Sequence, residues 1–181
     1  NPPLDIQNVT TANAQTIDVS FNLDVDPSSV QTSDFNITPN IGTPNNLSTS
    51  GNIVQLTYNN PIPGGEYTLT VSDIDDIEGN TIDPNADFNF QFFDSYTQGD
   101  ILINEFAYDH PMTINEEYIE LRNVSNKYLN LADWQIADNN SSSGLGSDPI
   151  PIEPNSFLVI SADTTELYNL FGIQSYHEAS F

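Results

Sequence analysis

The sequence predicts an all-β fold in which two sandwich modules follow one another along the chain. Short runs of alternating apolar and polar residues recur at spacings of about 8–12 residues, separated by clusters of Gly, Pro, Asn and Asp. Aromatic residues make up 10% of the 181 residues. Together with the alternation, this aromatic content indicates a folded protein although the chain is highly acidic.

The first module rests on the clearest alternation in the chain. In residues 17–23 every apolar residue has an odd number and every polar residue an even one, so one face packs and the other contacts water. Residues 67–71 follow the same rule, and the Pro- and Gly-rich segment 59–65 reverses the chain before them. The expected strands of this module are 16–23, 34–38, 52–58, 66–72 and 88–93.

The second module begins after a boundary near residues 95–99, so the expected domains are 1–98 and 99–181. One short helix is expected at 164–171, where Asp163 caps its start and Gly172 ends it. With only about two turns, this helix depends on packing. The expected strands are 101–107, 117–123, 128–131, 134–137 and 157–161.

The composition excludes several classes of function. With 26 acidic and 2 basic residues the formal net charge is -24, whereas a small domain usually has a charge of about 2–8 in magnitude. Clustered Lys and Arg bind phosphate groups, so no nucleic acid is expected as a partner, and anionic membrane surfaces are disfavoured. The absence of cysteine excludes disulfides and cysteine nucleophiles, and no apolar run is long enough for membrane insertion.

Six short motifs of the first module occur in a recognisable order. They are Val-Ser-Phe at 19–21, Val-Asp-Pro-Ser-Ser-Val at 25–30, Asp-Phe at 34–35, Gly-Glu-Tyr-Thr-Leu-Thr-Val at 65–71, Asp-Ile-Glu-Gly-Asn at 76–80 and Phe-Asn-Phe at 88–90. In this order they resemble the bacterial immunoglobulin-like (Ig-like) repeats of surface and adhesion proteins. The resemblance implies a seven-stranded sandwich that serves as a spacer or adhesive unit without catalysis.

Three motifs of the second module resemble the lamin tail domain, another Ig-like fold. They are Ile-Asn-Glu at 103–105, Glu-Tyr-Ile-Glu-Leu-Arg-Asn at 117–123 and Leu-Ala-Asp-Trp-Gln-Ile-Ala-Asp at 131–138, with residues 154–160 matching the next strand. Bacterial members of this family resemble accessory modules of extracellular proteins, including secreted nucleases and other hydrolases. The family adds two or three strands after the position of Phe181. Either the sequence stops short of them or the last sheet lacks its closing strands, and such an exposed strand edge allows a dimer or strand exchange.

Three glutamates of the second module are candidate functional carboxylates. By alternation Glu105 is in phase with Ile103 and Glu117 with Ile119, so both point toward the core unless a bulge intervenes, whereas Glu120 lies on the opposite face. One interpretation is a catalytic pair of the glycosidase type or a metal site. The favoured interpretation is that all three are structural carboxylates that accept backbone N–H bonds and fix loops.

The acidic loop at residues 72–80 is a candidate calcium site, with Asp73, Asp75, Asp76 and Asn80 as ligands. Calcium takes oxygen ligands from carboxylates and carbonyls, and extracellular modules bind it weakly. The spacing is not that of an EF-hand. The family resemblance implies instead that Asp76 and Asn80 shape a turn through bonds to the backbone. Calcium is therefore a candidate cofactor and no other cofactor is indicated, while residues 24–26 are a weaker calcium candidate.

Trp134 is the only tryptophan and His110 and His177 are the only histidines. A lone tryptophan could stack on a sugar, but its place in the lamin tail motif implies a core aromatic residue. Both histidines are expected in loops. The sequence has no Gly-x-Ser-x-Gly elbow and no glycine-rich phosphate loop, so it is not expected to be an enzyme.

Three functions remain after these exclusions. The first is a non-catalytic pair of modules in a secreted or cell-surface bacterial protein that acts as a spacer, adhesion or interaction unit. The second is a calcium-assisted module that binds a polysaccharide or a protein. The third is a set of accessory domains of an extracellular hydrolase or nuclease whose catalytic domain lies outside this chain.

Overall fold

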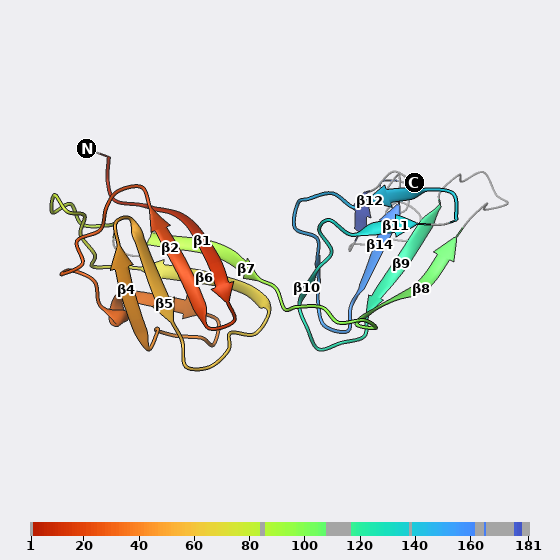
Figure 1. Cartoon of the computed structure of the whole chain (residues 1–181), viewed down its shortest axis with the longest axis horizontal. Helices are drawn as coiled ribbons and strands as arrows, with labels where there is room; N and C mark the ends of the chain where they lie inside the picture. Colours follow the sequence, from red (N-terminus) through yellow and green to blue (C-terminus); the bar gives the residue numbers. More distant parts are fainter. Residues whose placement is uncertain are drawn as a thin grey trace. The chain divides into compact units, whose positions relative to one another are not determined.

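The structure is a computed structural model that describes residues 2–83, 86–107, 117–137, 139–161, 165 and 176–178. The chain divides into two compact units, Asn1–Phe92 and Phe93–Phe181 (Figure 1). The boundary expected at residues 95–99 falls a few residues inside the second unit. The elements bounded within the described residues are β-strands and a three-residue 3-10 helix, η1 (Thr32–Asp34). The all-β prediction is confirmed, and the helix expected at 164–171 falls on residues outside those described, apart from Thr165.

The first unit has seven strands in two antiparallel sheets, which Figure 1 shows as separate layers. The four-stranded sheet has the order β1-β2-β5-β4 and the three-stranded sheet the order β3-β6-β7. Their bounds are β1 (Ile6–Asn13), β2 (Thr16–Phe21), β3 (Phe35–Thr38), β4 (Asn46–Ser50), β5 (Ile53–Thr57), β6 (Gly65–Val71) and β7 (Ala86–Phe92).

Period-two alternation fills the space between these two sheets. On β2 the odd-numbered Ile17, Val19 and Phe21 are buried, as expected, while the residues between them are half-buried. Phe35 on β3 and Leu69 on β6 are fully buried in the same cluster. The core is therefore made by inward side chains of both sheets, and burying each one contributes about 1.5–3 kcal/mol to folding.

The second unit is built around a four-stranded sheet of order β15-β14-β9-β8. Strands β14 and β15 are parallel, and the other neighbours are antiparallel. Two short antiparallel pairs, β10–β13 and β11–β12, complete the described strands. The bounds are β8 (Ile101–Ala107), β9 (Tyr118–Asn123), β10 (Leu129–Asn130), β11 (Gln135–Ala137), β12 (Ser142–Gly144), β13 (Pro151–Ile152), β14 (Phe157–Ser161) and β15 (Tyr176–Glu178).

A second apolar cluster lies inside this unit. Leu129 and Leu131 are fully buried beside Leu158 and Ile160 of β14. Trp134 is half-buried and packs against this cluster. The second unit thus has its own core, independent of the cluster in the first unit.

Candidate functional site

The acidic loop of the first unit is a turn organised by Asp76. This side chain is only 2% exposed, and its Oδ1 accepts the backbone N–H groups of Glu78 and Asn80 at 2.8 and 2.9 Å. Its Oδ2 accepts the side-chain amide of Asn80 at 2.7 Å. These bonds, led by the one from the Asn80 side chain, hold the pKa of Asp76 below its usual value. Both carboxylate oxygens are therefore engaged within the turn.

The two other acidic residues predicted as calcium ligands, Asp73 and Asp75, do not form a metal-holding group with Asp76 among the described residues. Asp73 is exposed in the left-handed backbone region with φ of 58°, and Asp75 accepts the hydroxyl of Thr81 at 2.6 Å. Asp26 of the weaker candidate accepts the backbone N–H and hydroxyl of Ser28. Within the part of the chain that the structure describes, no three His, Cys, Asp or Glu side chains form a group that could hold a metal.

Replacing Asp76 with Asn is expected to lower the unfolding midpoint at neutral pH, because Asn offers fewer acceptors to the three donors. A carboxyl whose pKa is depressed in the fold stabilises above its unfolded pKa of about 4, and this contribution is lost as pH falls through the folded value. The difference between the two proteins should therefore shrink in acid. Thermal unfolding at neutral and acidic pH measures it, with exposed Asp73→Asn as the matched control.

The same melting curves address calcium directly. If Asp76 serves only the turn, the wild-type midpoint is the same in chelator and in millimolar calcium. A midpoint that rises in calcium for the wild type, but not for Asp76→Asn, would contradict the turn role and restore the metal site.

A β-bulge decides where the glutamates of the second unit point. The register of β8 on β9 shifts between Ile103 and Glu105, so Ile103 lies opposite Leu121 while Glu105 lies opposite Glu120. The prediction placed Glu105 toward the core unless a bulge intervened, and a bulge does intervene: the extra residue moves Glu105 to the outer face, where it is exposed. Glu117 precedes β9 and is also exposed, contrary to the same prediction.

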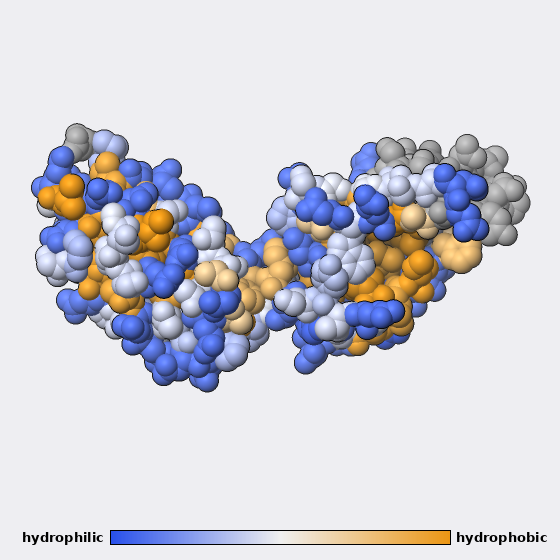
Figure 2. Space-filling model, in the orientation of Figure 1, coloured by the Kyte–Doolittle hydropathy of each residue, from blue (hydrophilic) through white to orange (hydrophobic). Residues whose placement is uncertain are grey.

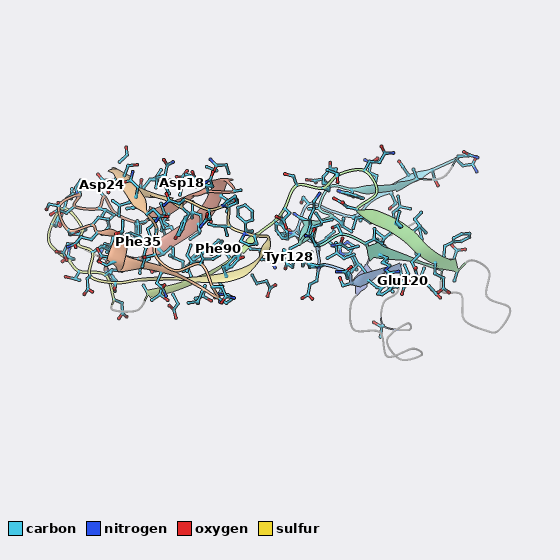
Figure 3. The ribbon with its side chains drawn as sticks, turned by 90° about the horizontal axis from the view of Figure 1, so that it is seen from below. Asp18, Asp24, Phe35, Phe90, Glu120 and Tyr128 are labelled. Atoms are coloured by element: carbon cyan, nitrogen blue, oxygen red, sulfur yellow. The ribbon has the colours of Figure 1, made fainter. Side chains whose placement is uncertain are left out.

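Glu105 and Glu120 are neighbours across two strands, and each accepts a side-chain hydrogen bond. Glu105 accepts the Tyr118 hydroxyl at 2.8 Å, and Glu120, labelled in Figure 3, accepts the amide of Asn104 at 2.6 Å. The donors are therefore side chains and not the backbone N–H groups that the sequence led us to expect. At Glu117 the backbone carbonyl accepts the Ser161 hydroxyl. Glu105 is exposed and Glu120 half-buried, and the charges of the two facing carboxylates repel each other.

The pKa of Tyr118 depends on this pair of carboxylates. Burial, followed by the hydrogen bond to Glu105 and the charges of Glu105 and Glu120, raises its pKa to about 12. A raised phenol pKa stabilises the fold below the unfolded pKa of about 10, and this contribution is lost as pH rises through the folded value. The titration is followed by phenolate absorbance. Tyr118→Phe should remove one phenol that titrates at the alkaline end of the curve. Glu105→Gln should lower the pKa of Tyr118.

If the titration curve of Tyr118→Phe differed from that of the wild type only near pH 10, the pKa of Tyr118 would not be raised by burial and the two glutamates.

Asn123 is a structural polar residue that the sequence analysis did not single out. It is fully buried, and its amide nitrogen donates to the carbonyls of Lys127, Ile152 and Glu153 at 2.7, 3.2 and 2.9 Å. Its Oδ1 accepts the N–H and hydroxyl of Ser125. Asn123 thus joins the end of β9 to the chain after β13. Its position as the last residue of the lamin tail motif is the one sequence signal for it.

Both basic side chains of the protein have structural partners. Lys127 forms an ion pair with Asp100 at 2.7 Å, and its hydrogen bond is the main reason that the pKa of Asp100 is lowered. The guanidinium of Arg122 lies 5.2 Å from the centre of the Phe157 ring. Both positively charged side chains of the protein therefore contact residues of the second unit.

The predicted core aromatic residue, Trp134, lies at the margin of the second core. The ring of Tyr96 meets it edge-on with 5.1 Å between ring centres. His177, expected in a loop, lies instead in β15, and its Nε2 is 2.6 Å from the carbonyl oxygen of Leu145. His110 falls outside the described residues.

These two units, each with sheets stacked over its own core, define a tandem protein of Ig-like β-sandwich modules. The family model of the bacterial Ig-like domain matches residues 1–92, and that of the lamin tail domain matches residues 94–181. The chain belongs to the bacterial Ig-like domain family and continues with a lamin tail domain. The suspected pair of families and their order are confirmed.

The sequence matches none of the curated proteins. The chain is similar to the N-terminal part of the bacterial S-layer protein SbsC, with a TM-score of 0.48 and 13% identity over 86% of this chain and 42% of that chain. It is also similar to the S-layer protein rSbsC(31-844), with a TM-score of 0.47 and 12% identity over 88% and 32% of the two chains. This chain spans less than half the length of either protein.

Proposed function

We propose that this chain is a non-catalytic pair of modules in a secreted or cell-surface bacterial protein, where it spaces, presents or attaches other parts of that protein. The observation that supports this most directly is that the carboxylates of the candidate sites accept hydrogen bonds from neighbouring groups of the protein. Asp76 is engaged in its turn, and Glu105 and Glu120 each accept a hydrogen bond from a neighbouring side chain of the sheet. Catalytic carboxylates work instead in clefts that enclose a substrate.

The location of the protein is part of the same proposal. The first unit belongs to a bacterial Ig-like family, and the chain is cysteine-free and strongly acidic. Among the described residues no helix has the length and apolar character needed to cross a membrane. A high net charge keeps a protein soluble and monomeric, which suits a module exposed to the medium.

Two measurements test this function. Antibodies against the purified chain should label intact cells of the source bacterium, and brief protease treatment of those cells should remove the label. Labelling that needs permeabilised cells would refute the location. Panels of nuclease and glycosidase substrates should show no turnover with the purified chain, and turnover that is lost in Glu105→Gln or Glu120→Gln would refute the non-catalytic role.

A glycan array separates the spacer role from the second function. The spacer role predicts no glycan bound above background, either with calcium or with chelator. Binding that requires calcium would replace the spacer role with that of a calcium-assisted carbohydrate-binding module.

A further inference from the structure

Two loops at one end of the first unit border a hollow of about 690 Å³. One loop, residues 39–45, joins β3 to β4, and the other, residues 58–64, joins β5 to β6 (Figure 1). The loops adjoin because Asn46 at the start of β4 pairs with Thr57 at the end of β5. A volume of about 300–1,000 Å³ is usual for a ligand site, so the hollow is large enough to bind one.

Hydrogen bonds hold both loops in place. Asn45 accepts the backbone N–H of Asn59 at 2.7 Å, which ties one loop to the other. Gly42 and Ile37 exchange backbone bonds at 2.8 and 3.0 Å, and the side-chain amide of Gln15 donates to the carbonyl of Asn59 at 2.8 Å. The hollow is therefore formed before a ligand arrives, which lowers the entropic cost of binding.

A second hollow of about 690 Å³ continues the first. The two share Pro39, Glu66 and Tyr67. Thr68 and Asn89 line the second hollow from β6 and β7, and both alternate with the buried residues of their strands. The second hollow thus lies on the outward side of the β3-β6-β7 sheet. Together the hollows make an elongated surface, which suits an extended chain better than a compact small molecule.

Side-chain amides recur along this surface. Asn45 and Asn60 line the first hollow, and Asn89 and Gln91 line the second. Each amide carries two N–H donors and one acceptor oxygen, and these complement the C=O and N–H groups of a peptide. An extended peptide leaves those backbone groups without internal partners. The polar lining therefore fits a peptide backbone.

The two tyrosines of the first hollow present little open ring surface. Tyr58 is 5% exposed and Tyr67 is 9% exposed. A sugar needs an open aromatic face to stack on, and neither ring provides one. Pro61 and Pro63, which also line the hollow, are exposed and give a rigid surface for apolar side chains. This lining favours a peptide over a saccharide.

The charge of the first unit selects a basic peptide. Residues 1–92 contain no Lys or Arg, and exposed Glu66 lies where the two hollows meet. Figure 2 shows that the visible face of this unit is mostly hydrophilic, so polar and charged contacts are the main ones it offers a partner. A second copy of this chain would bring another net charge of -24. A chain that carries Lys or Arg is attracted instead.

We propose that the two adjoining hollows of the first unit bind an extended basic segment of a protein partner. The amides of Asn60 and Asn89 bond to its backbone, a Lys or Arg side chain lies beside Glu66, and its apolar side chains contact Pro61 and Pro63. This partner goes beyond the spacer role and does not depend on it.

Two synthetic peptides test the proposal by calorimetric titration of the whole chain. One alternates Lys with Pro and the other alternates Glu with Pro, because proline favours an extended backbone. The Lys peptide should bind, more weakly as salt is raised, and the Glu peptide should not.

Matched variants separate the site from the general charge of the chain. Glu66→Gln should weaken binding of the Lys peptide about threefold or more, whereas Asp73→Asn removes the same charge from an exposed residue that lines neither hollow and should have a smaller effect. Asn60→Ala should weaken binding about threefold to tenfold through the loss of a hydrogen bond. Asn8→Ala is its control, since Asn8 is exposed on β1 and lines neither hollow.

No binding of the Lys peptide, equal binding of the Glu peptide, or equal effects of Asn60→Ala and Asn8→Ala would each overturn the proposal. So would spermine that binds as tightly as the Lys peptide and is weakened by Glu66→Gln but not by Asn60→Ala, because the site would then recognise amine charge alone. A neutral glycan whose binding Asn60→Ala abolishes would make a saccharide the occupant. Failure of the Lys peptide to bind would leave the substrate panels and cell labelling that test the spacer role unchanged.

Discussion

Phe35→Ala is expected to lower the free energy of unfolding of the first unit by about 3–5 kcal/mol, the usual cost of truncating a buried Phe. Phe35 is 0% exposed on β3, within the cluster that joins the two sheets (Figure 3). Its removal takes away apolar burial and leaves a cavity that the flanking strands cannot fully close. Denaturant unfolding followed by circular dichroism measures the change.

The control for Phe35 is a large apolar residue outside the core. Ile77 is 67% exposed, so Ile77→Ala should change the free energy of unfolding by no more than about 0.5 kcal/mol. Equal effects of the two substitutions would mean that Phe35 is not packed between the sheets.

Asn123→Ala is expected to cost the second unit about 3 kcal/mol. The substitution removes the donor that the carbonyls of Lys127 and Ile152 share, and it leaves Ser125 without its acceptor. The carbonyl of Glu153 also loses this donor but keeps the N–H and hydroxyl of Ser156. A buried polar group that loses its partner typically costs about 1–3 kcal/mol, and several are affected here. Trp134 is the only tryptophan and packs against the second core, so its fluorescence follows the unfolding of this unit.

Asn104→Ala is the matched control, since Asn104 is an exposed asparagine of the same unit with a side-chain bond to Glu120. It should cost less than about 1 kcal/mol. If Asn123→Ala is equally mild, water or a rearranged backbone satisfies the carbonyls and Asn123 is not the main link between these segments.

Strong alternation of apolar and polar residues made the fold class predictable from the sequence. Where the alternation is weak, individual strands could not be predicted. Residues 17–23 placed β2 correctly because one of its faces is wholly buried. Strand β1 escaped prediction because its buried residues, Ile6 and Val9, are three apart, and the pairing of β1 with β2 has irregular register. Strand β4 has a single large apolar residue, Leu47, and is held by its pairing with β5. Sheet pairing, and not local pattern, defines both strands.

The candidate site was less predictable because its geometry depends on distant partners. Alternation cannot reveal a bulge, so it could not show that Glu105 joins Glu120 on the outer face. The carbonyls bound by Asn123 include two that lie 29 and 30 residues further along the chain. The residues around Asn123 in the sequence give no indication of these two distant carbonyls. The family resemblance, by contrast, implied a turn at Asp76, where the donors are Glu78 and Asn80 and therefore local.

The bulge in β8 also affects how this chain should be aligned with its relatives. Ile103 and Phe106 share a face although three positions separate them, so the two halves of the strand follow different odd and even numbering. A related domain with a regular strand would have one residue fewer here. Its sequence would match this one only if a gap of one position were opened between Ile103 and Glu105, and an ungapped comparison would set its inward residues against carboxylates.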